Sequence, residues 1–397
     1  MFIRTYSMNQ FSTASAVTSA EVSKATPTQR YLSLDVLRGM TIALMIVVNT
    51  PGSWETVYAP FRHAPWHGFT ITDLVFPTFL FVVGNAMSFS MRKFEKQDDR
   101  VFLITVFKRT ALIFIIGVFL NAFPFVTGKA GELTLINFSN IRIMGVLQRI
   151  ALCYCVASLV IHYWKVKGAL LFSALALSVY WAVMYFYGSQ PDPYSLEANA
   201  ALNFDLLLIP AQNLYKGYGI PFDPEGLLST LAAVVNVIAG FFAGRFIQVQ
   251  GNNKSTVVKL ALAGIILTVA ALFWNVYFPI NKPIWTSSYV LLTIGLGLLI
   301  LAILMLVIEV ASFKRWTFFF EVFGKNPLFI YILSGMLIEM MSLIRVRGES
   351  LSGWIYQHLF ANWLEGNNAS LGFAVCYMLL LWLIGYGMDK KKLYIRV

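Results

Sequence analysis

The residues best suited to chemistry lie around position 65, where histidines and an aspartate stand beside a long apolar run. His63 and His67 come just before the run at 69–91, and Asp73 lies in its first turn. Histidine is the side chain whose ordinary pKa lies closest to neutral, so it can accept a proton at physiological pH. An aspartate ten residues further on can orient a histidine through its second ring nitrogen, as in the base-and-orienter pairs of acyl transfer. The pattern predicts that Asp73 orients a proton-accepting His63.

Other polar residues of this region have chemical or structural interpretations. Asn49, at the outer end of the preceding apolar run, can donate hydrogen bonds to an oxyanion that develops during acyl transfer. Pro65 lies between His63 and His67 and argues against one shared helix, so the pair lacks the spacing of a helical zinc site. We therefore expect no metal, and we interpret His67 as an ordinary interfacial residue.

The elements that carry these residues are predicted to be membrane helices. The chain has 397 residues, of which 58% are hydrophobic and only 12% are charged. A soluble protein of this size carries about twice that charged fraction. Several apolar runs reach about 20 residues, the length of a helix that crosses the hydrocarbon core, and they do not alternate as barrel strands would. The sequence predicts an all-α, polytopic integral membrane protein.

About ten transmembrane helices are predicted. They are expected at 34–51, 69–91, 109–126, 143–162, 168–187, 225–245, 257–278, 285–309, 316–340 and 370–388. With both termini in the cytoplasm, the inner segments hold twenty Lys and Arg and the outer segments hold seven, in agreement with the positive-inside rule. The net charge of +11 is therefore interpreted as basic cytoplasmic loops rather than as a nucleic-acid surface.

This topology places the two histidines outside and Asp73 at the outer mouth of the second span. Residues 1–30 are predicted to be a disordered cytoplasmic tail, and residues 31–397 a single transmembrane domain. The longest outer loop, 188–224, is aromatic and acidic, and it is long enough to cover a site as a lid.

Charged side chains within the predicted spans form two layers. A charge at mid-span costs about 2.5–3.5 kcal/mol on the insertion scale, so these residues are functional candidates, with structural ion pairs between helices as the alternative. The sequence GKNP at 324–327 breaks a helix and exposes backbone groups, which are tolerated only against protein or a water-filled cavity. The pattern predicts a polar passage through the bundle. The inner layer holds Asp35, Arg38, Glu321 and Lys325, and the outer layer holds Asp73, Arg149 and Glu225.

Six stretches resemble, in family order, the transmembrane acetyltransferases typified by heparan-α-glucosaminide N-acetyltransferase and their shorter bacterial relatives. The second and fourth are the most specific, whereas the first is shared with other membrane acyltransferases. The stretches are RYLSLDVLRG (30–39), HAPWHGFTITDLVFPTFLFVVG (63–84), GVLQRIALCY (145–154), FDPEGLLSTL (222–231), PINKPIWTSSYVL (279–291) and GKNPLFIYI (324–332).

The resemblance implies transfer of acetyl from cytoplasmic acetyl-CoA to the amino group of a glucosamine-type sugar on the outer side, by a helical bundle that forms a homodimer. The family's catalytic histidine corresponds to His63 and its active-site asparagine to Asn49, with Asp73 orienting His63 or binding the sugar. His63 would act as a base or as a nucleophile. The expected CoA contacts are Arg38, Arg245, Lys325 and Asn326, and the expected acceptor contacts are Asp223, Glu225, Lys282, Trp285 and Arg149.

Two alternative functions fit parts of the pattern. An amino-sugar transporter would also have charges in its spans and a broken helix, although we find no internal repeat of the transporter type. A glycan O-acetyltransferase would differ only in taking a hydroxyl instead of an amine. The compact form of the chain, without a lumenal domain, leads us to expect a bacterial inner membrane, with membrane lipid and the acceptor glycan as partners.

Overall fold

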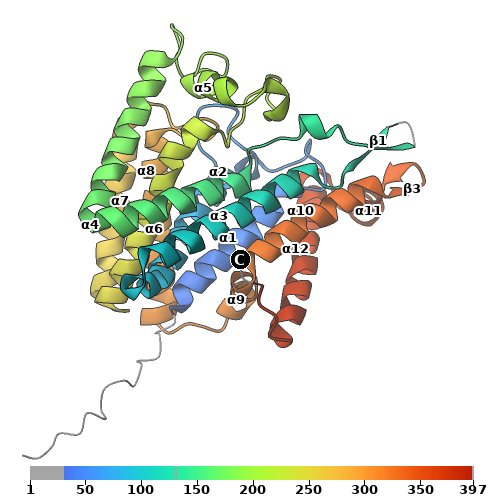
Figure 1. The fold of residues 1–397 in the computed structure, drawn as a ribbon. Helices are drawn as coiled ribbons and strands as arrows, with labels where there is room; N and C mark the ends of the chain where they lie inside the picture. Colours follow the sequence, from blue (N-terminus) through green and yellow to red (C-terminus); the bar gives the residue numbers. More distant parts are fainter. Residues whose placement is uncertain (1–30, 130–131, 396–397) are drawn as a thin grey trace, which may run out of the picture. The chain divides into compact units, whose positions relative to one another are not determined.

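Apolar stretches too long for a soluble core fold here as helices, which satisfy their own backbone hydrogen bonds inside a membrane. A computed structural model describes residues 31–129 and 132–395, so the predicted tail 1–30 lies outside the described residues. The described residues from Leu32 onward form one compact unit (Figure 1). Its α-helices are α1 (Leu32–Asn49), α2 (Ile71–Ser90), α3 (Asp99–Ala122), α4 (Val146–Tyr187), α5 (Ala200–Leu208), α6 (Leu227–Gln250), α7 (Lys254–Trp274), α8 (Ser287–Met305), α9 (Thr317–Lys325), α10 (Pro327–Leu343), α11 (Leu351–Tyr356) and α12 (Gly366–Lys390).

The number of membrane spans depends on how two irregular helices are counted. Within the described residues, eight helices are long and apolar enough to cross a membrane, and the bent pair α9–α10 makes a ninth. Helix α4 has 42 residues and leaves helical geometry at Lys165. A straight helix of that length would measure about 63 Å, about twice the hydrocarbon thickness. If α4 is counted as two spans, the number of spans in the described residues is ten. The prediction of an all-α polytopic membrane protein is confirmed.

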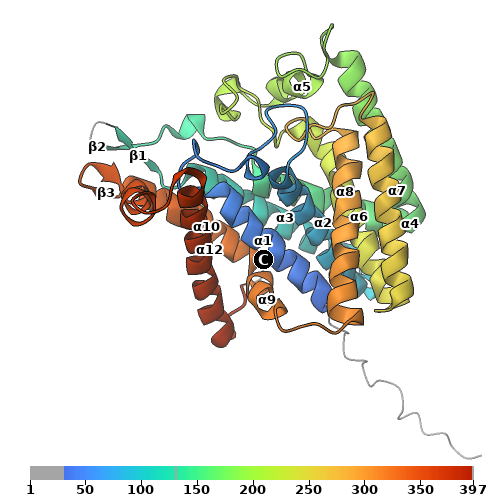
Figure 2. The same ribbon diagram turned by 180° about the vertical axis from the view of Figure 1, so that it is seen from behind.

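The spans form a central group and a peripheral group within the bundle, which differ in how much of their apolar surface is buried by protein. Helices α2 and α6 are the most buried, with 72% of their apolar windows covered by protein, and α1 and α8 follow with 61%. Helices α3, α4, α7 and α12 have only 22–33% of these windows covered, so most of their apolar surface faces outward. Helix α7 packs against α8, and α3 packs against α4 (Figure 2). The helix that carries Asp73 therefore stands at the centre of the bundle.

The central pair, α2 and α6, cross with their backbones in contact. A Cβ added to Gly84 would lie 1.9 Å from the carbonyl oxygen of Val237, and one added to Gly240 would lie 1.9 Å from that of Phe81. Only glycine fits at such a crossing, which is the small-residue packing common between membrane helices. The middle of α2 is thus held firmly against α6.

One predicted span begins at a different place in the structure. Helix α3 starts at Asp99, ten residues before the predicted 109–126, and its N-cap Asp98 accepts a hydrogen bond from the Arg100 amide. Val101, Ile104 and Phe107 are exposed apolar residues that extend the outward face of the helix. The basic pair at 108–109 interrupts the apolar run in the sequence, so this part of the helix was not predicted as a span. Arg109 lies over the Tyr154 ring of α4, 4.7 Å from its centre.

The GKNP stretch breaks the helix as predicted. Helices α9 and α10 meet at an angle of 82° on either side of Asn326. The Asn326 side chain donates to the Leu393 carbonyl at 3.0 Å and accepts from the Ile395 amide at 2.9 Å. The end of the chain therefore satisfies polar groups at the break.

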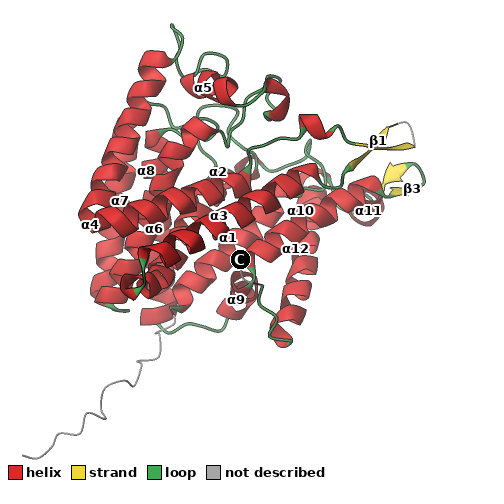
Figure 3. Ribbon diagram, viewed as in Figure 1, coloured by secondary structure: helices red, strands yellow, loops and turns green. Residues whose placement is uncertain are grey.

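Loops and short elements gather at the end of the bundle that carries Asp73. Helix α5 and the loops around it lie at the upper end in Figure 1, together with the segment that joins α1 to α2. Two hairpins extend from one edge at this end (Figure 3). They are formed by β1 (Val126–Lys129) with β2 (Glu132–Leu135) and by β3 (Arg345–Val346) with β4 (Glu349–Ser350).

Candidate active site

The first turn of α2 positions the Asp73 carboxylate. Thr70 is the N-cap of the helix, and Asp73 is the third residue after it, so the two form a capping box. Asp73 Oδ2 accepts hydrogen bonds from the Thr70 amide at 3.0 Å, the Thr70 hydroxyl at 3.0 Å and the Ala64 amide at 3.2 Å. The hydroxyl of Tyr289 on α8 also donates to the Asp73 carbonyl at 2.6 Å. One carboxylate oxygen is therefore fully used in fixing the start of the helix.

The other carboxylate oxygen faces His63. Asp73 Oδ1 lies 2.6 Å from His63 Nδ1, and the two side chains are 1% and 50% exposed. A buried carboxylate beside Nδ1 favours the tautomer with its proton on Nδ1, which leaves Nε2 with a free lone pair. The structure thus brings together the two residues that the sequence placed ten positions apart.

Lys282, on the loop between α7 and α8, lies against the same imidazole. Its Nζ is 3.1 Å from His63 Nδ1, 3.3 Å from Nε2 and 3.7 Å from Asp73 Oδ1. The two loops are joined by a hydrogen bond from the Gly68 amide to the Ile280 carbonyl at 2.8 Å. Burial lowers the pKa of Lys282, while Asp73 and Glu225 act in the opposite direction. An amine and an imidazole therefore share one carboxylate.

His67 takes a different place in the same segment. Its Nδ1 lies 3.3 Å from the Asn281 side-chain nitrogen, and burial lowers the pKa of its imidazole against the opposing effect of Asp192. The side chain is directed to the neighbouring loop, which is consistent with its interpretation as an ordinary interfacial residue.

Arg142 joins the predicted acceptor residues Asp223 and Glu225. Its Nε and Nη2 bind the two Asp223 oxygens at 2.8 and 2.6 Å, and Nη2 also donates to Glu225 Oε2. Burial alone would lower the pKa of Arg142, but the two carboxylates hold it above its ordinary value. Its guanidinium also lies 4.7 Å from the centre of the Tyr215 ring. Sequence reasoning had counted Arg142 only as a loop charge, because its partners lie about 80 positions away.

Arg149 and Trp285, two further acceptor candidates, lie deeper. Both side chains are fully buried, and the guanidinium carbon of Arg149 stands 4.8 Å from the centre of the Trp285 ring. Arg149 Nη2 donates to the Gly226 carbonyl at 3.1 Å and to Ser229, whereas its Nε and Nη1 have no hydrogen-bond partner among the described residues. Trp285 donates to Asn236 Oδ1 at 3.2 Å. Arg149 and Trp285 therefore lie in the buried interior below the site and not on its exposed surface.

The long loop 188–224 packs onto the HAPWHG segment through aromatic side chains. Trp66 makes edge contacts with the rings of Tyr218 and Phe222, at centroid distances of 6.0 and 5.6 Å. Its indole also donates to the Tyr194 carbonyl at 2.9 Å. Asp205 on α5 fastens the loop to α6, because it accepts hydrogen bonds from the Leu227 and Leu228 amides at 2.9 and 3.2 Å. The predicted lid is docked in this structure.

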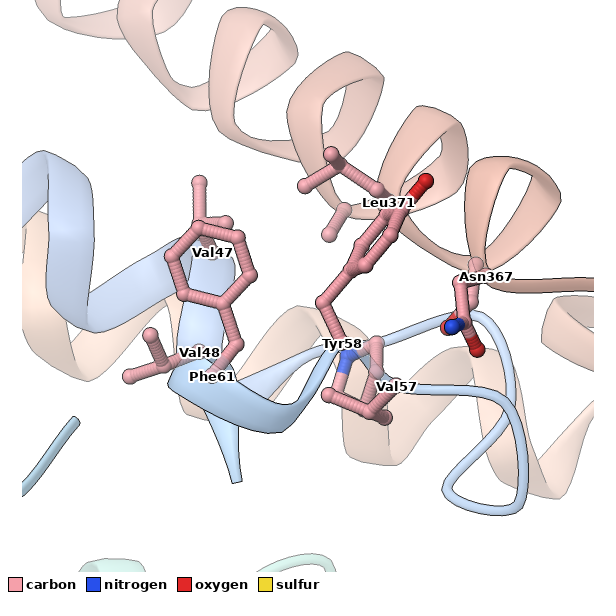
Figure 4. A pocket seen from close by; sticks show the side chains of 10 residues that line it. Val47, Val48, Val57, Tyr58, Phe61, Asn367 and Leu371 are labelled. Carbon is pink, nitrogen blue, oxygen red and sulfur yellow. The ribbon is translucent and has the colours of Figure 1, made fainter. Parts of the chain in front are cut away.

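Asn49 lies at the exposed end of α1, beside a small apolar pocket. Figure 4 shows this pocket, of about 20 Å³, between Val48 of α1, Tyr58 and Phe61 of the following segment, and Leu371 of α12. Among the described residues, Asn49 makes no hydrogen bond to His63.

The predicted CoA residues lie at the other end of α1 and on α6. Arg38 binds Asp35 at 3.4 Å and the Gly324 carbonyl at 3.3 Å. Lys325 forms a salt bridge with Asp389 at 2.8 Å, and its neighbour Asn326 holds the end of the chain. Arg245 is exposed near the end of α6, a helix that packs against α2, α4 and α8. The structure thus groups Arg38, Lys325 and Asn326 around the helix break.

An apolar cavity of about 360 Å³ extends along α1 between these two ends. Its lining begins at Leu37, beside Arg38, and reaches Val47 and Leu74, the residue that follows Asp73. Phe319 and Phe320 of α9 close one side. Its two threonines, Thr41 and Thr78, both donate to carbonyls of their own helices, so the walls are apolar. Among the described residues, no cluster of His, Cys, Asp and Glu could hold a metal ion.

Fold and site together define a polytopic helical membrane protein with a His–Asp pair at one end of its bundle. The family model of the heparan-alpha-glucosaminide N-acetyltransferase catalytic region matches residues 30–207, which include both residues. The Mus musculus heparan-alpha-glucosaminide N-acetyltransferase is 26% identical over 358 residues, covering 76% of this chain and 53% of its own length. The Homo sapiens protein of the same name is 25% identical over 360 residues, with coverages of 76% and 52%.

Residues 30–207 thus match this family model, and the chain is similar to heparan-α-glucosaminide N-acetyltransferases, in line with the resemblance of its motifs. It spans about half the length of the curated relatives that it matches.

Proposed function

We propose that this chain transfers acetyl from acetyl-CoA, bound from the inner side, to the amino group of a glucosamine-type sugar at the outer mouth. The observation that carries the proposal is the 2.6 Å contact between His63 Nδ1 and Asp73 Oδ1 in a region matched by an N-acetyltransferase family. A half-exposed imidazole oriented by a buried carboxylate is the arrangement that acyl transfer requires of its base.

In this mechanism Nε2 of His63 takes a proton from the acceptor amine as the amine attacks the thioester carbonyl. The carbon–sulfur bond breaks, the amide bond forms, and the CoA thiol leaves. An alternative order has Nε2 accept the acetyl group first and pass it to the amine. In either order Asp73 holds the imidazole, and we assign the stabilisation of the developing oxyanion to Asn49.

The cavity along α1 supports a route for the donor. Its lining runs from Leu37, the residue before Arg38, to Leu74, the residue after Asp73, and its apolar walls suit the thin arm and thioester end of acetyl-CoA. We assign the phosphates to the basic groups at the inner end, Arg38, Lys325 and Arg245, with Asn326 beside them. Because Lys325 is already paired with Asp389, phosphate binding there would require exchange of that salt bridge.

The acceptor is assigned to the outer mouth, between Lys282 and the carboxylates that Arg142 holds. The pKa of Lys282 is lowered by burial, and the charge of Glu225 acts in the opposite direction, which supports assigning both clusters to one acceptor site. The basic inner segments support cytoplasmic termini. From the motif resemblance we also propose a homodimer and a bacterial inner membrane.

The test is release of CoA thiol by purified protein given acetyl-CoA, with and without glucosamine. His63→Ala should lower sugar-dependent release by about 10²–10⁴-fold, the contribution of a positioned base. His358→Ala is the matched control, because among the described residues the side chain of this exposed outer histidine hydrogen-bonds only the Trp354 carbonyl one turn earlier. Equal activity of wild type and His63→Ala would refute the assignment of His63 as the base of the reaction.

The same assay separates the alternatives. Release that needs a sugar hydroxyl and proceeds without an amine would make the chain an O-acetyltransferase. If folded wild type releases no thiol with any amino sugar and instead carries amino sugar into proteoliposomes, it is a transporter.

A further inference from the structure

Lys282 stands where an acceptor amine would have to stand. Its Nζ lies 3.1 and 3.3 Å from the two ring nitrogens of His63. A general base must lie within hydrogen-bond reach of the proton that it removes, and an acceptor amine would need this same separation. The Lys282 side chain is 18% exposed and comes from a loop that is hydrogen-bonded to the HAPWHG segment, so it is held at this position.

The surroundings of Lys282 also favour the reactive form of its amine. Only a neutral amine can attack a carbonyl, and burial lowers the pKa of Lys282. Among the described residues, the carboxylate in contact with it is that of Asp73, which also receives His63 and the capping hydrogen bonds of α2. Shared in this way, Asp73 holds the ammonium less firmly than a dedicated partner would. Half of the His63 side chain is exposed, which provides a path for a proton to reach water.

We propose that, when no acceptor sugar is present, Lys282 Nζ accepts the acetyl group within the chain itself. This inference rests on the proposed function, because it needs a bound acetyl donor beside His63. The Lys282 amine attacks the thioester carbonyl, and its departing proton goes to His63 Nε2. The carbon–sulfur bond breaks, the sulfur takes that proton from His63 Nε2 and leaves as the CoA thiol, and an acetyl-lysine amide forms. The product has no positive charge left to pair with Asp73.

The experiment uses the full-length protein in detergent, incubated with isotopically labelled acetyl-CoA and no sugar. Peptide mass mapping then gives the labelled fraction of each lysine. Lys216 is the internal control, since it lies in the neighbouring outer loop, is exposed and has no hydrogen bond to a histidine among the described residues. We expect labelling of Lys282 to exceed that of Lys216 by on the order of tenfold or more, because a positioned amine reacts far faster than a free one.

Two variants sharpen the result. His63→Ala should reduce the Lys282 label to the level of Lys216, and Lys282→Arg should remove one labelled acetyl from the intact mass. Glucosamine added with the donor should suppress the label by competing for the same position. Sugar-dependent thiol release is measured on the same preparation.

Equal labelling of Lys282 and Lys216, or label on Lys282 that persists in His63→Ala, would overturn the inference. An unlabelled Lys282 in protein that acetylates glucosamine would overturn it while leaving the proposed function intact. Protein that neither acetylates a sugar nor labels Lys282 would refute both.

Discussion

Replacement of Asp73 by asparagine preserves the shape of the side chain but changes which of its atoms can accept hydrogen bonds. Oδ2 receives three donors, the amides of Ala64 and Thr70 and the Thr70 hydroxyl, at 3.0–3.2 Å. Oδ1 faces His63 Nδ1 at 2.6 Å, with Lys282 Nζ farther away at 3.7 Å. The single oxygen of an amide will keep the three donors, so the new NH₂ group will face the imidazole.

An NH₂ group at this position makes Nδ1 an acceptor and moves the neutral imidazole's proton to Nε2. Nε2 then has no lone pair with which to take a proton. The equivalent exchange in the serine protease triad lowers kcat by about 10⁴-fold, or about 5 kcal/mol. Because half of the His63 side chain is exposed, water competes with the amide for the ring, and we expect about 10³-fold here.

The assay is the initial rate of glucosamine-dependent CoA release at saturating concentrations of both substrates. Glu55→Gln is the matched control, because it removes one exposed carboxylate from the same outer segment. The affinity for CoA and the melting temperature should stay near those of wild type, since the helix cap keeps its acceptor. A folded Asp73→Asn protein with at least a third of wild-type kcat would refute the assignment of Asp73 as the group that orients His63.

Two further predictions concern the support of the site and its lid. Gly84→Ala places a Cβ 1.9 Å from the Val237 carbonyl, so it should destabilise the protein by about 3 kcal/mol in denaturant titration, whereas Gly387→Ala, with nothing within 4 Å, should not. Burial raises the pKa of Asp205 to about 6, so the folded state binds its proton more tightly than the unfolded state. The free energy of unfolding of wild type should therefore fall relative to Asp205→Asn, by up to about 3 kcal/mol, as pH rises from about 4 through 6. If the difference in free energy of unfolding between wild type and Asp205→Asn did not change with pH, the raised pKa of Asp205 would be contradicted.

Features set by local sequence could be predicted. The spans follow from the length and composition of apolar runs, and the break at 324–327 follows from the backbone chemistry of Gly and Pro. The ten-residue spacing of His63 and Asp73 is short enough for one turn and one helix start to bring them together. The start of α3 was predicted wrongly because two basic residues interrupt its apolar face, although Arg109 is accommodated on a tyrosine ring.

Features set by distant partners could not be predicted. Arg142 shows no motif of its own, and its role as the clamp of Asp223 and Glu225 exists only because α4 and α6 begin side by side. Trp285 was expected at the mouth but is fully buried, since neither its depth nor its contact with Arg149 can be read from a loop sequence. The pairing of Lys325 with Asp389 likewise depends on the path of the end of the chain.

The double duty of Asp73 ties the reaction to the membrane itself. The same carboxylate closes the first turn of α2 and holds the imidazole, so His63 moves with the axial position and tilt of that helix. Lys282 is carried by the loop between α7 and α8 and follows a different pair of helices. A bilayer thicker or thinner than the apolar length of these helices changes their tilt. If the chain carries out the proposed reaction, lipid chain length should change the spacing of His63 and Lys282, and bilayer thickness should change the rate.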